Sequence, residues 1–440
     1  MKKRKQSFTN PDLRRQTKVP APPCEEIEQQ LWKLLEPEKF TPMHLMKLKD
    51  EKKLRARVLT LPVMMAVVVS LVYRQIAGLR EVIRILSEEG LMWVEPIEVS
   101  AQALSKRLQT LPVELFAQIW QQVIERIRTS QRVLPIPPLW EAVHEKFTAI
   151  WIADASTLEE LRKKLKALQG EGTVLGGKMM MVVEAFSHRL VNSWYTEDAQ
   201  ANEKTFCNQL LATLPKGGLL IFDLGFFKFA WFDEFTNTEK FFVTRFREKT
   251  AHRVVRSLSS GPFYRDEIIQ MGLHHTNPCQ HQVRLVSVLW GKSWYHYLTN
   301  VLDPAVLSPQ QVCDLYRRRW RIEDAFGLTK RLLGLAYLWV GASNGVQIQI
   351  FATWIFYAVL NELSADVAIA LNQPLERISL EMVFRSLYHY ARALLRGDAS
   401  DLISYFTSRP QLLGLVKSER KRHRQSADQS QLIWGTAALS

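Results

Sequence analysis

The sequence contains little cysteine and no long uninterrupted hydrophobic run. Its 440 residues include only four scattered cysteines, Cys24, Cys207, Cys279 and Cys313. Their spacing excludes a disulfide framework and a zinc ribbon, and it favours a reducing compartment. Internal repeats and low-complexity tracts are absent as well, which excludes a repeat architecture.

The most apolar run, Val58 to Tyr73, is shorter than a membrane span and is interrupted by Pro62. It therefore predicts a buried helix, and we expect no membrane partner. The basic N-terminus is not followed by an apolar segment, so a secretory signal is not predicted. We therefore expect a cytoplasmic protein.

Acidic residues are in deficit. Lys and Arg number 58 against 44 Asp and Glu, which gives a net charge of +14 and a sequence pI near 9.6. This balance indicates a polyanionic partner, although charge alone fits nucleic acid and an anionic membrane equally well. The basic residues gather in a flexible arm at 1–25, in a turn that contains Arg317 and Arg318, and in a tail at 416–440. Such segments attract phosphates, and solvated tails without a partner are the alternative.

Hydrophobic periodicity divides the chain into helical ends and a strand-rich middle. Helical patterns dominate residues 26–145 and 341–415. Between them lie short apolar runs that are typical of strands, at 147–153, 178–185, 189–195 and, after a helix at about 200–213, at 217–222. Three strands, a helix and a fourth strand is the order of a ribonuclease H-like domain.

The predicted fold class is α+β or α/β, with a ribonuclease H-like catalytic core that is interrupted by a β-rich insertion. The core takes residues 146–238 and resumes at 304–340. The insertion takes residues 239–303, because the further β-like runs exceed what such a core needs; these runs are 241–246, 282–290 and 294–300. Helical N- and C-terminal regions flank the core.

The helical N-terminal region, 26–145, is the predicted DNA-binding domain. Its segment from Ser100 to Arg107 combines small polar side chains with the cations Lys106 and Arg107. A short helix of this composition is suited to entering a DNA groove. An amphipathic helix that contacts only its neighbours is equally consistent with the pattern.

One predicted helix combines a carboxylate with cations. At about 100° per residue, its reactive side chains fall within one narrow stripe, at roughly 0°, 300°, 340° and 320° for Tyr316, Arg319, Glu323 and Lys330. A second ridge is apolar and is expected to face a core, namely Leu315, Ile322, Phe326 and Leu333. A carboxylate between Arg and Lys suits a metal ion bound to a phosphate. Ion pairs along an ordinary exposed helix are the alternative.

Two aspartates follow apolar strands at the point where a strand meets solvent. Asp154 follows 147–153, and Asp223 follows 219–222. One such acid is commonly a turn former or a helix cap. Together with Glu323, however, the pair would bind about two Mg²⁺ or Mn²⁺ ions, which prefer oxygen ligands. Two such ions activate an attacking oxygen and stabilise the leaving one at a phosphodiester.

The same residues carry a family resemblance. Tyr316, Arg319, Glu323 and Lys330 match the Y-x2-R-x3-E-x6-K signature of bacterial insertion-sequence transposases of the DDE class, the IS-four family. The sequence from Leu298 to Lys330 resembles that family, and weaker similarity extends back to about residue 58.

The resemblance implies that Asp154, Asp223 and Glu323 form the catalytic, metal-binding triad. It implies cleavage at transposon ends, passage through a hairpin, and strand transfer into target DNA by a homodimer on paired ends. The DNA partners are then the terminal inverted repeats and the target duplex. Arg319 and Lys330 would hold terminal phosphates, and Tyr316 would contact the end nucleotide.

The sequence departs from the family pattern after each aspartate. Leu224 follows Asp223 where Arg is common, and Ala155 follows Asp154 where Gly is common. Both carboxylates remain, but a DNA contact by the missing Arg is in doubt. Two alternatives stay open: a catalytically decayed transposase that only binds DNA, and a ribonuclease H-like nuclease that cleaves without joining.

Two groups within the expected insertion have further candidate roles. Trp290 and Trp294 are suited to stacking a base turned out of the duplex, with ordinary strand packing as the alternative. A second group has metal-ligand chemistry but fits no standard zinc spacing, and we expect a polar loop there; it comprises His274, His275, Cys279 and His281.

Overall fold

The computed structural model describes most of the chain as two compact units. It describes residues 21–40, 58–76, 78–129, 138–157, 177–196, 201–331, 342–418 and 429–434, with single residues at 134, 136, 198, 333 and 339. The helical unit comprises Met1–Val133, Leu158–Gly177 and Ala325–Val416, and the sheet unit comprises Leu134–Thr157, Lys178–Asp324 and Lys417–Ser440. The predicted basic arm lies outside the described residues as far as residue 20.

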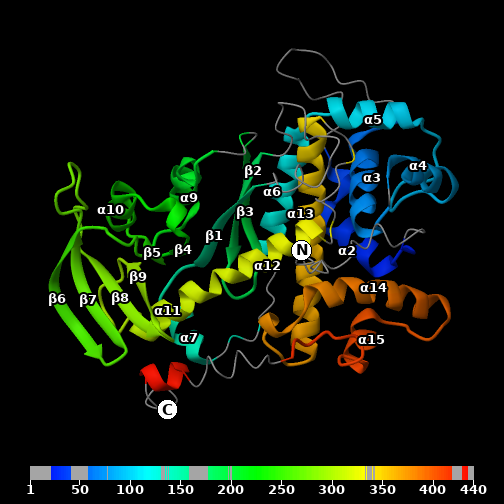
Figure 1. The fold of residues 1–440 in the computed structure, drawn as a ribbon. Helices are drawn as coiled ribbons and strands as arrows, with labels where there is room; N and C mark the ends of the chain where they lie inside the picture. Colours follow the sequence, from blue (N-terminus) through cyan, green and yellow to red (C-terminus); the bar gives the residue numbers. More distant parts are fainter. Residues whose placement is uncertain are drawn as a thin grey trace, which may run out of the picture. The chain divides into compact units, whose positions relative to one another are not determined.

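The described helical unit is built around one long helix. Its helices are α2 (Glu25–Leu35), α3 (Leu61–Tyr73), α4 (Leu79–Glu88), α5 (Ala101–Thr110), α6 (Val113–Thr129), α13 (Ser343–Ala370), α14 (Leu380–Leu395) and α15 (Leu402–Ser408). Figure 1 shows α13 running among α3, α6 and α14. The predicted N- and C-terminal helical regions thus contribute to a single core.

Helix α13 is apolar on all sides because it is surrounded by other helices. By length and composition the segment Asn344–Ala370 resembles a membrane span, but 94% of its most apolar window is buried inside the structure. Asn344, near its first turn, donates hydrogen bonds to the carbonyl oxygens of Leu108 and Leu111, at the end of α5. These contacts identify α13 as the core helix of the helical unit.

The sheet unit contains one nine-stranded sheet in the order β3-β2-β1-β4-β5-β9-β8-β7-β6. The strands are β1 (Ile150–Thr157), β2 (Lys178–Glu184), β3 (Leu190–Thr196), β4 (Leu219–Ile221), β5 (Phe241–Arg245), β6 (His252–Gly261), β7 (Tyr264–Met271), β8 (Val283–Trp290) and β9 (Ser293–Thr299). Its helices are α7 (Pro138–His144), α9 (Cys207–Thr213), α10 (Phe229–Asn237), α11 (Pro309–Arg318) and the start of α12 (Trp320–Arg331). The chain is therefore a mixed α/β protein with a large sheet and helices.

The first strands follow the predicted order of three strands, a helix and a fourth strand. β1, β2 and β3 are antiparallel neighbours, α9 follows, and β4 then pairs parallel with β1. β5 pairs parallel with β4, so Phe241–Arg245 belongs to this central part of the sheet. The structure differs here from the predicted division, which began a separate β-rich insertion at residue 239. Instead, β9, β8, β7 and β6 extend the same sheet beyond β5.

One face of the sheet is covered by α9 and α10. Leu220, Phe222 and Phe242 from the strands share a core cluster with Phe206 and Leu210 beside the strands, and with aromatic side chains of α10. Helix α11 packs against β5, β8 and β9 on the other side (Figure 1). Because successive side chains of a strand point to opposite faces of the sheet, the neighbours of these core residues point toward the face that α11 covers.

Part of the predicted basic tail is folded. Residues 429–434 are helical, and the ring of Trp434 lies 5.0 Å from the ring of Tyr264 on β7. Residues 419–428 and 435–440 of the tail lie outside the described residues. The tail is thus anchored on the sheet unit through an aromatic contact.

Candidate active site

The pairing of β1 with β4 brings Asp154 and Asp223 together. These strands are adjacent and parallel, and Ile152 lies opposite Ile221. Each aspartate lies two residues beyond this pair, so the two side chains leave neighbouring strands at the same level and on the same face. The register of the sheet thereby brings two of the three predicted catalytic acids together.

The two aspartates differ in their local backbone. Asp223 follows β4, as the sequence predicts, and stands before the short helix η5 (Leu224–Phe226). Asp154 lies within β1, which continues to Thr157 and pairs there with β2, so the prediction that a strand ends before it was wrong. The backbone N–H of Ala155 donates to Oδ1 of Asp154 at 2.9 Å and fixes that carboxylate.

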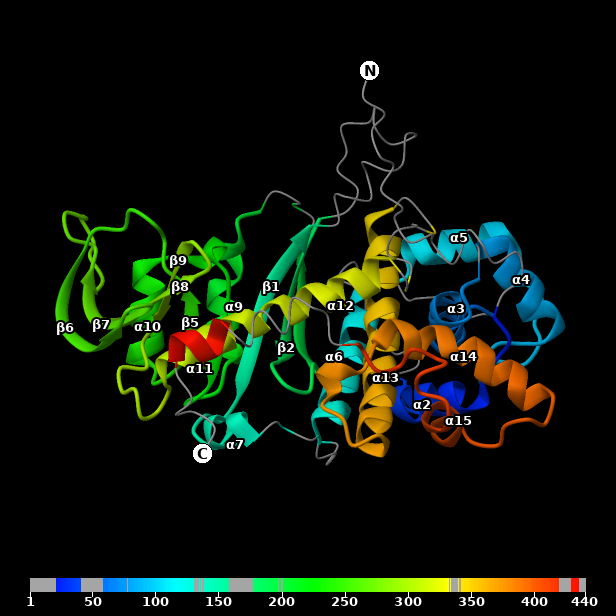
Figure 2. The ribbon, with the colours of Figure 1, turned by 60° about the horizontal axis from the view of Figure 1, so that its bottom comes forward.

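The predicted single helix is interrupted at Arg319. α11 ends at Arg318 and α12 begins at Trp320, and the N–H of Arg319 donates to the carbonyl of Tyr316 rather than of Leu315. Arg319 keeps helical dihedral angles, so the backbone stays helical where α11 gives way to the start of α12 (Figure 2). The apolar ridge is confirmed, because all four of its members are buried: Leu315, Ile322, Phe326 and Leu333.

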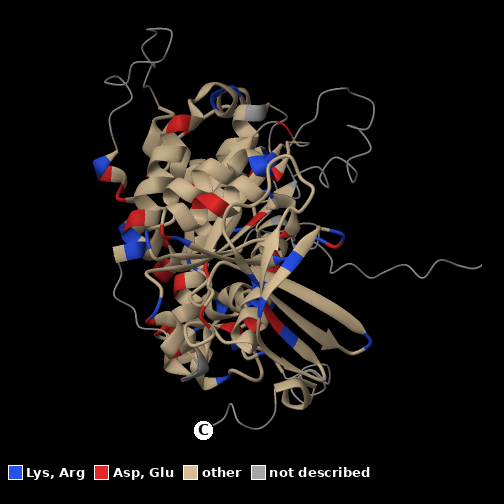
Figure 3. Ribbon diagram, turned by 90° about the vertical axis from the view of Figure 1, so that its left-hand side faces the viewer, with Lys and Arg blue, Asp and Glu red and all other residues tan. Residues whose placement is uncertain are grey.

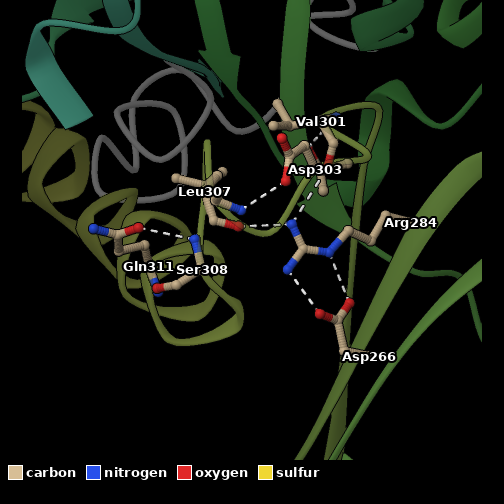
Figure 4. Close-up of polar contacts among 9 residues, drawn as sticks. Asp266, Arg284, Val301, Asp303, Leu307, Ser308 and Gln311 are labelled. Atoms are coloured by element: carbon tan, nitrogen blue, oxygen red, sulfur yellow. Dashed lines mark hydrogen bonds and ion pairs between the residues drawn. The ribbon is translucent and has the colours of Figure 1, made fainter. Parts of the chain in front are cut away.

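A buried ion pair fixes the start of α11. Figure 4 shows Arg284 of β8 binding both carboxylate oxygens of Asp266 on β7, at 2.7 and 2.8 Å. Its Nη1 also donates to the carbonyl of Leu307 at 2.6 Å, just before Ser308. Ser308 and Gln311 then form a capping box that satisfies two backbone N–H groups at the helix N-terminus.

The guanidinium of Arg319 contacts all three predicted catalytic acids. Its Nη1 lies 2.7 Å from Oδ2 of Asp154, and its Nη2 lies 3.9 Å from Oδ2 of Asp223 and 3.5 Å from Oε1 of Glu323. Three acids that are far apart in sequence therefore converge around one cation: Asp154 from a strand, Asp223 from the turn after a strand, and Glu323 from a helix. The family resemblance implies a phosphate contact for Arg319 instead.

The cluster is reachable from solvent. The side chain of Asp154 is 13% exposed, whereas those of Asp223 and Glu323 are 39% and 43% exposed. Arg319 lies beneath them, with 7% of its side chain exposed. Ions and phosphates thus have access to the acids from the side opposite the arginine.

Tyr316 is buried and supports Asp223. Its hydroxyl donates to Oδ1 of Asp223 at 2.8 Å, and its ring packs 5.2 Å from the ring of Tyr297. Only 5% of the residue is exposed, which leaves no free ring face for a nucleotide. In this structure Tyr316 therefore orients Asp223. The helical spacing of Tyr316 in the sequence did not indicate this role.

Burial and neighbouring charge change the pKa values in the cluster. Burial raises the pKa of Asp154 to about 7, and the charges of Glu203 and Asp223 also raise it, while Arg319 and the Ala155 N–H lower it. Burial, the charge of Asp223 and the hydrogen bond to it raise the pKa of the Tyr316 hydroxyl. For Arg319, burial lowers the pKa, but the acids around it raise it more. Arg319 thus stays charged among the acids.

The acids fit a divalent cation in donor chemistry. All of them offer carboxylate oxygens, the ligands that Mg²⁺ and Mn²⁺ prefer. As the side chains stand, no group of three potential ligands among the described residues is close enough to hold an ion. The guanidinium of Arg319 lies between the acids instead and supplies the positive charge there. Binding of an ion to all three acids requires this guanidinium to move aside.

Four predicted DNA contacts take part in contacts between a guanidinium group and an aromatic ring. The guanidinium of Arg317 lies 3.9 Å from the centre of the Trp290 ring, and that of Arg265 lies 5.5 Å from the centre of the exposed Trp294 ring. Arg318 lies over two rings of the sheet unit, those of Trp140 and Phe186. Lys330 is helical, but its side chain is outside the described part of the chain.

Lys106 and Arg107 belong to the helical unit. They line a pocket of about 500 Å³ together with Val58, Leu59 and Ser100. The Nε of Arg107 donates to the carbonyl of Leu59, and partial burial lowers the pKa of its guanidinium. Arg107 is thus partly committed to the fold, while Lys106 faces the pocket.

The loop with metal-ligand chemistry is held by a buried acid. Asp233 of α10 accepts hydrogen bonds from the Sγ of Cys279 and from the backbone N–H groups of Gln280 and His281. The ring of His281 contacts Asn237 instead of another potential ligand. The arrangement is that of a loop capped by a carboxylate.

Sequence reasoning did not single out Glu203, a fourth acid beside the cluster. It opens the short helix η4 (Glu203–Phe206) before α9, and its charge acts on Asp154. No motif or spacing links it to the other acids, because the contact arises from the packing of η4 on η5.

Comparisons with known proteins find similarity to transposases. Residues 146–358 match the family model described as the transposase DDE domain. A probable transposase for insertion sequence element IS5377 of Geobacillus stearothermophilus is 26% identical over 173 residues, which is 38% of this chain and 45% of that protein. The putative transposase y4zB of Sinorhizobium fredii is 26% identical over 232 residues, which is 50% of this chain and 62% of that protein.

The chain thus spans about half the length of the curated relatives it matches. Among solved structures, a piggyBac transposase synaptic complex with hairpin DNA aligns over 90% of this chain and 84% of its own, at 11% identity and a TM-score of 0.37. That similarity is too low to carry an argument. The family model and the relatives both point to transposases: residues 146–358, slightly under half of the chain, are similar to the transposase DDE domain.

Proposed function

We propose that this protein cleaves DNA at the ends of its insertion sequence and joins those ends to target DNA, with Asp154, Asp223 and Glu323 as the catalytic acids. The observation that carries the proposal is the convergence of three carboxylates around the Arg319 guanidinium. The order β3-β2-β1-β4-β5, with β1, β4 and β5 parallel, supports a ribonuclease H-like core beneath them.

The three acids would hold Mg²⁺ or Mn²⁺, two ions in all. When bound, these ions activate the attacking oxygen and stabilise the leaving oxygen of a phosphodiester. The chain's own contribution is positional: the Ala155 N–H holds Asp154, the Tyr316 hydroxyl holds Asp223, and the first turn of α12 presents Glu323. Each acid is thus oriented before DNA arrives, which lowers the cost of assembling the site.

In this proposal Arg319 first neutralises the acids and later contacts DNA. Without an ion it neutralises the acids, and once ions occupy the cluster it is released toward a DNA phosphate, together with Lys330. Trp294 offers an exposed ring for a base that leaves the duplex, as a hairpin intermediate requires. The proposal also includes that the protein acts as a homodimer on paired DNA ends and that it is of the IS-four type, whose signature its sequence resembles.

The test is a cleavage assay on the terminal repeats of the element with Mg²⁺ or Mn²⁺ present. We expect Asp154→Ala, Asp223→Ala and Glu323→Ala each to reduce cleavage at least 10³-fold, as the loss of a metal-binding catalytic group does, while DNA affinity changes little. Asp324→Ala is the matched control, because Asp324 follows Glu323 on α12 but points to solvent, with 69% of its side chain exposed. This control should cleave like the wild type.

The alternatives give different products. A decayed transposase would bind the ends without metal-dependent nicking by the wild type, and Leu224, which packs on the core in place of the family's Arg, is the feature that favours it. A nuclease would cleave but yield no joined product when a target plasmid is supplied. Full cleavage by any one of the three alanine variants would remove that residue from the proposed triad.

A further inference from the structure

Arg245 is the last residue of β5 and lies in one row of the sheet with two of the three converging acids. In the parallel pairing of β4 with β5, Ile221 lies opposite Val243. Asp223 and Arg245 each stand two residues beyond this pair, as Asp154 does beyond the corresponding pair of β1 with β4. Adjacent strands are about 4.8 Å apart. Asp223 is therefore flanked by Asp154 on one side and by Arg245 on the other.

The side chain of Arg245 points to the face of the sheet that carries the acids. Phe242 and Phe246 of the same stretch belong to the core cluster on the opposite face, and side chains alternate along a strand. In the antiparallel pairing of β5 with β9, Tyr297 is the partner of Arg245. The ring of Tyr297 packs on that of Tyr316 of α11. Arg245 thus shares this face with α11.

The charge of Arg245 acts at the hydroxyl that supports Asp223. Burial, the charge of Asp223 and the hydrogen bond to it raise the pKa of the Tyr316 hydroxyl, and the charge of Arg245 acts against them. Burial likewise raises the pKa of the Tyr297 hydroxyl to about 12, against the charges of Arg317 and Arg245. These effects agree with the position that the register gives to the guanidinium, beside Asp223.

Arg245 has no counter-ion of its own. Within the part of the chain that the structure describes, its half-buried side chain makes no hydrogen bond, ion pair or ring contact. Other cations near the acids are engaged: Arg319 contacts three carboxylates, and Arg317 pairs with Asp314 and lies over the ring of Trp290. A half-buried guanidinium without a partner, on a strand that is paired on both sides, is suited to binding an anion from outside the chain.

We propose that Arg245 binds a phosphate of the cleaved DNA strand, next to the phosphodiester on which the acids act. The inference rests on the proposed function, because it adds a DNA contact to the same site. The turn after Asp223 does not supply such a cation, because Leu224 packs on the core. Arg245 takes this place from the neighbouring strand, and its planar guanidinium is suited to two parallel hydrogen bonds to phosphate oxygens. Such a contact holds DNA without reading its sequence.

The experiment measures binding of terminal-repeat duplexes by fluorescence anisotropy without metal ions. In each duplex one phosphate near the cleavage position is replaced by a neutral methylphosphonate. For the wild type, we expect one of these replacements to weaken binding at least about tenfold, the effect of losing a hydrogen bond between charged groups. Arg245→Gln should weaken binding of the unmodified duplex by a similar factor, and its affinity should not respond to that replacement.

Two further variants separate this contact from general attraction. Arg253→Gln removes an exposed cation from the edge strand β6 of the same unit, and it should keep the full response to the methylphosphonate. Arg245→Lys keeps the charge but loses the paired hydrogen bonds, and it should bind with intermediate affinity. Arg245→Gln should melt at the wild-type temperature, because Arg245 has no partner within the described residues to lose.

A structural role for Arg245 gives the contrary result. Arg245→Gln would then melt at a lower temperature and respond to each methylphosphonate as the wild type does, which would overturn the inference. Because binding needs no chemistry, this test is independent of cleavage. A wild type that shows the expected response but cleaves nothing would refute the proposed function and leave the phosphate contact standing. A wild type that cleaves, while Arg245→Gln keeps the full response, would remove the contact alone.

Discussion

Arg319 occupies the place of a cation among the acids. It is fixed at both Nη atoms, while its buried Nε has no partner among the described residues. A guanidinium makes five N–H donors available, so this contact is incomplete for the arginine even though it satisfies the acids. An incomplete contact of this kind is suited to being exchanged for a metal ion.

We expect Arg319→Gln to destabilise the metal-free protein. Removing one partner leaves Asp154 buried beside other acids, and breaking a buried pair costs about 3 kcal/mol. Mn²⁺ should restore much of that loss by taking the place of the guanidinium. The measurement is the urea midpoint of unfolding with and without Mn²⁺.

The control for Arg319 is Arg321→Gln, because Arg321 pairs only loosely with Asp324, at 3.8 Å on the surface. It should shift the midpoint little, since surface pairs contribute about 0–1 kcal/mol. Equal Mn²⁺ stabilisation of the wild type and Arg319→Gln would show that the guanidinium does not compete with the ion.

Tyr316 offers a second test at the scale of a single residue. Tyr316→Phe keeps the ring and removes the hydrogen bond to Asp223. Because hydrogen bonds to charged groups contribute about 1.5–3 kcal/mol, we expect cleavage to slow by roughly tenfold or more. DNA affinity should not change, as measured by fluorescence anisotropy of an end duplex.

A stacking role for Tyr316 gives the contrary result. Phenylalanine stacks as well as tyrosine, so a residue that held a base would keep its activity in Tyr316→Phe and lose affinity only in Tyr316→Ala. Tyr295→Phe serves as the matched control, because that tyrosine is exposed on β9.

At the scale of elements, the strands that the sequence predicts are those with apolar runs. β2, β4 and β8 are buried through most of their length and β1 through most of its first half, and their apolar runs indicate them directly. Asp154 and Asp223 lie at the same level because β1 and β4 pair in parallel, and no local sequence pattern encodes that pairing. The convergence of the acids was therefore predictable in outline, and its geometry was not.

Two strands escaped prediction for a physical reason. β6 is exposed along most of its length and so lacks an apolar stripe. β7 contains Asp266, whose charge argues against a buried strand until its partner Arg284 is known from the fold. The break at Arg319 was missed likewise, because no glycine or proline marks it and its dihedral angles remain helical.

The pair of Arg284 with Asp266 supports a prediction at this scale. Both side chains are fully buried, and Arg284 also holds the carbonyl of Leu307 before α11. Arg284→Met leaves Asp266 uncompensated, and we expect a loss of about 3–5 kcal/mol in the free energy of unfolding. Chemical unfolding followed by tryptophan fluorescence measures it.

The companion variant separates charge from packing. Asp266→Leu combined with Arg284→Met removes both charges, so most of the stability should return, because an apolar pair of similar volume often replaces a buried ion pair without loss. If the double variant is no more stable than Arg284→Met, the contacts to Leu307 and Val301 outweigh the ion pair.

At the scale of the whole molecule, the net charge of +14 is unevenly spread along the sequence. On the described ribbon, basic and acidic positions are interspersed (Figure 3). Residues 1–20 alone carry seven Lys and Arg against one Asp. The general attraction to DNA phosphates should therefore depend strongly on this arm, whereas the chemistry depends on the acids of the sheet unit.

Removing the positive charges of the N-terminal arm tests whether the arm controls DNA affinity while the acids control cleavage. Replacing Lys2, Lys3, Arg4 and Lys5 by Gln should weaken binding to any duplex and reduce the slope of log affinity against log salt by up to about 0.9 for each phosphate that the arm no longer neutralises. Because the acidic cluster is untouched, the cleavage rate at saturating DNA should stay that of the wild type. Affinity measured between about 50 and 200 mM salt, together with single-turnover cleavage, separates the two effects. A reduced rate at saturation with an unchanged salt slope would mean that the arm acts on the chemistry and not on the general attraction to DNA.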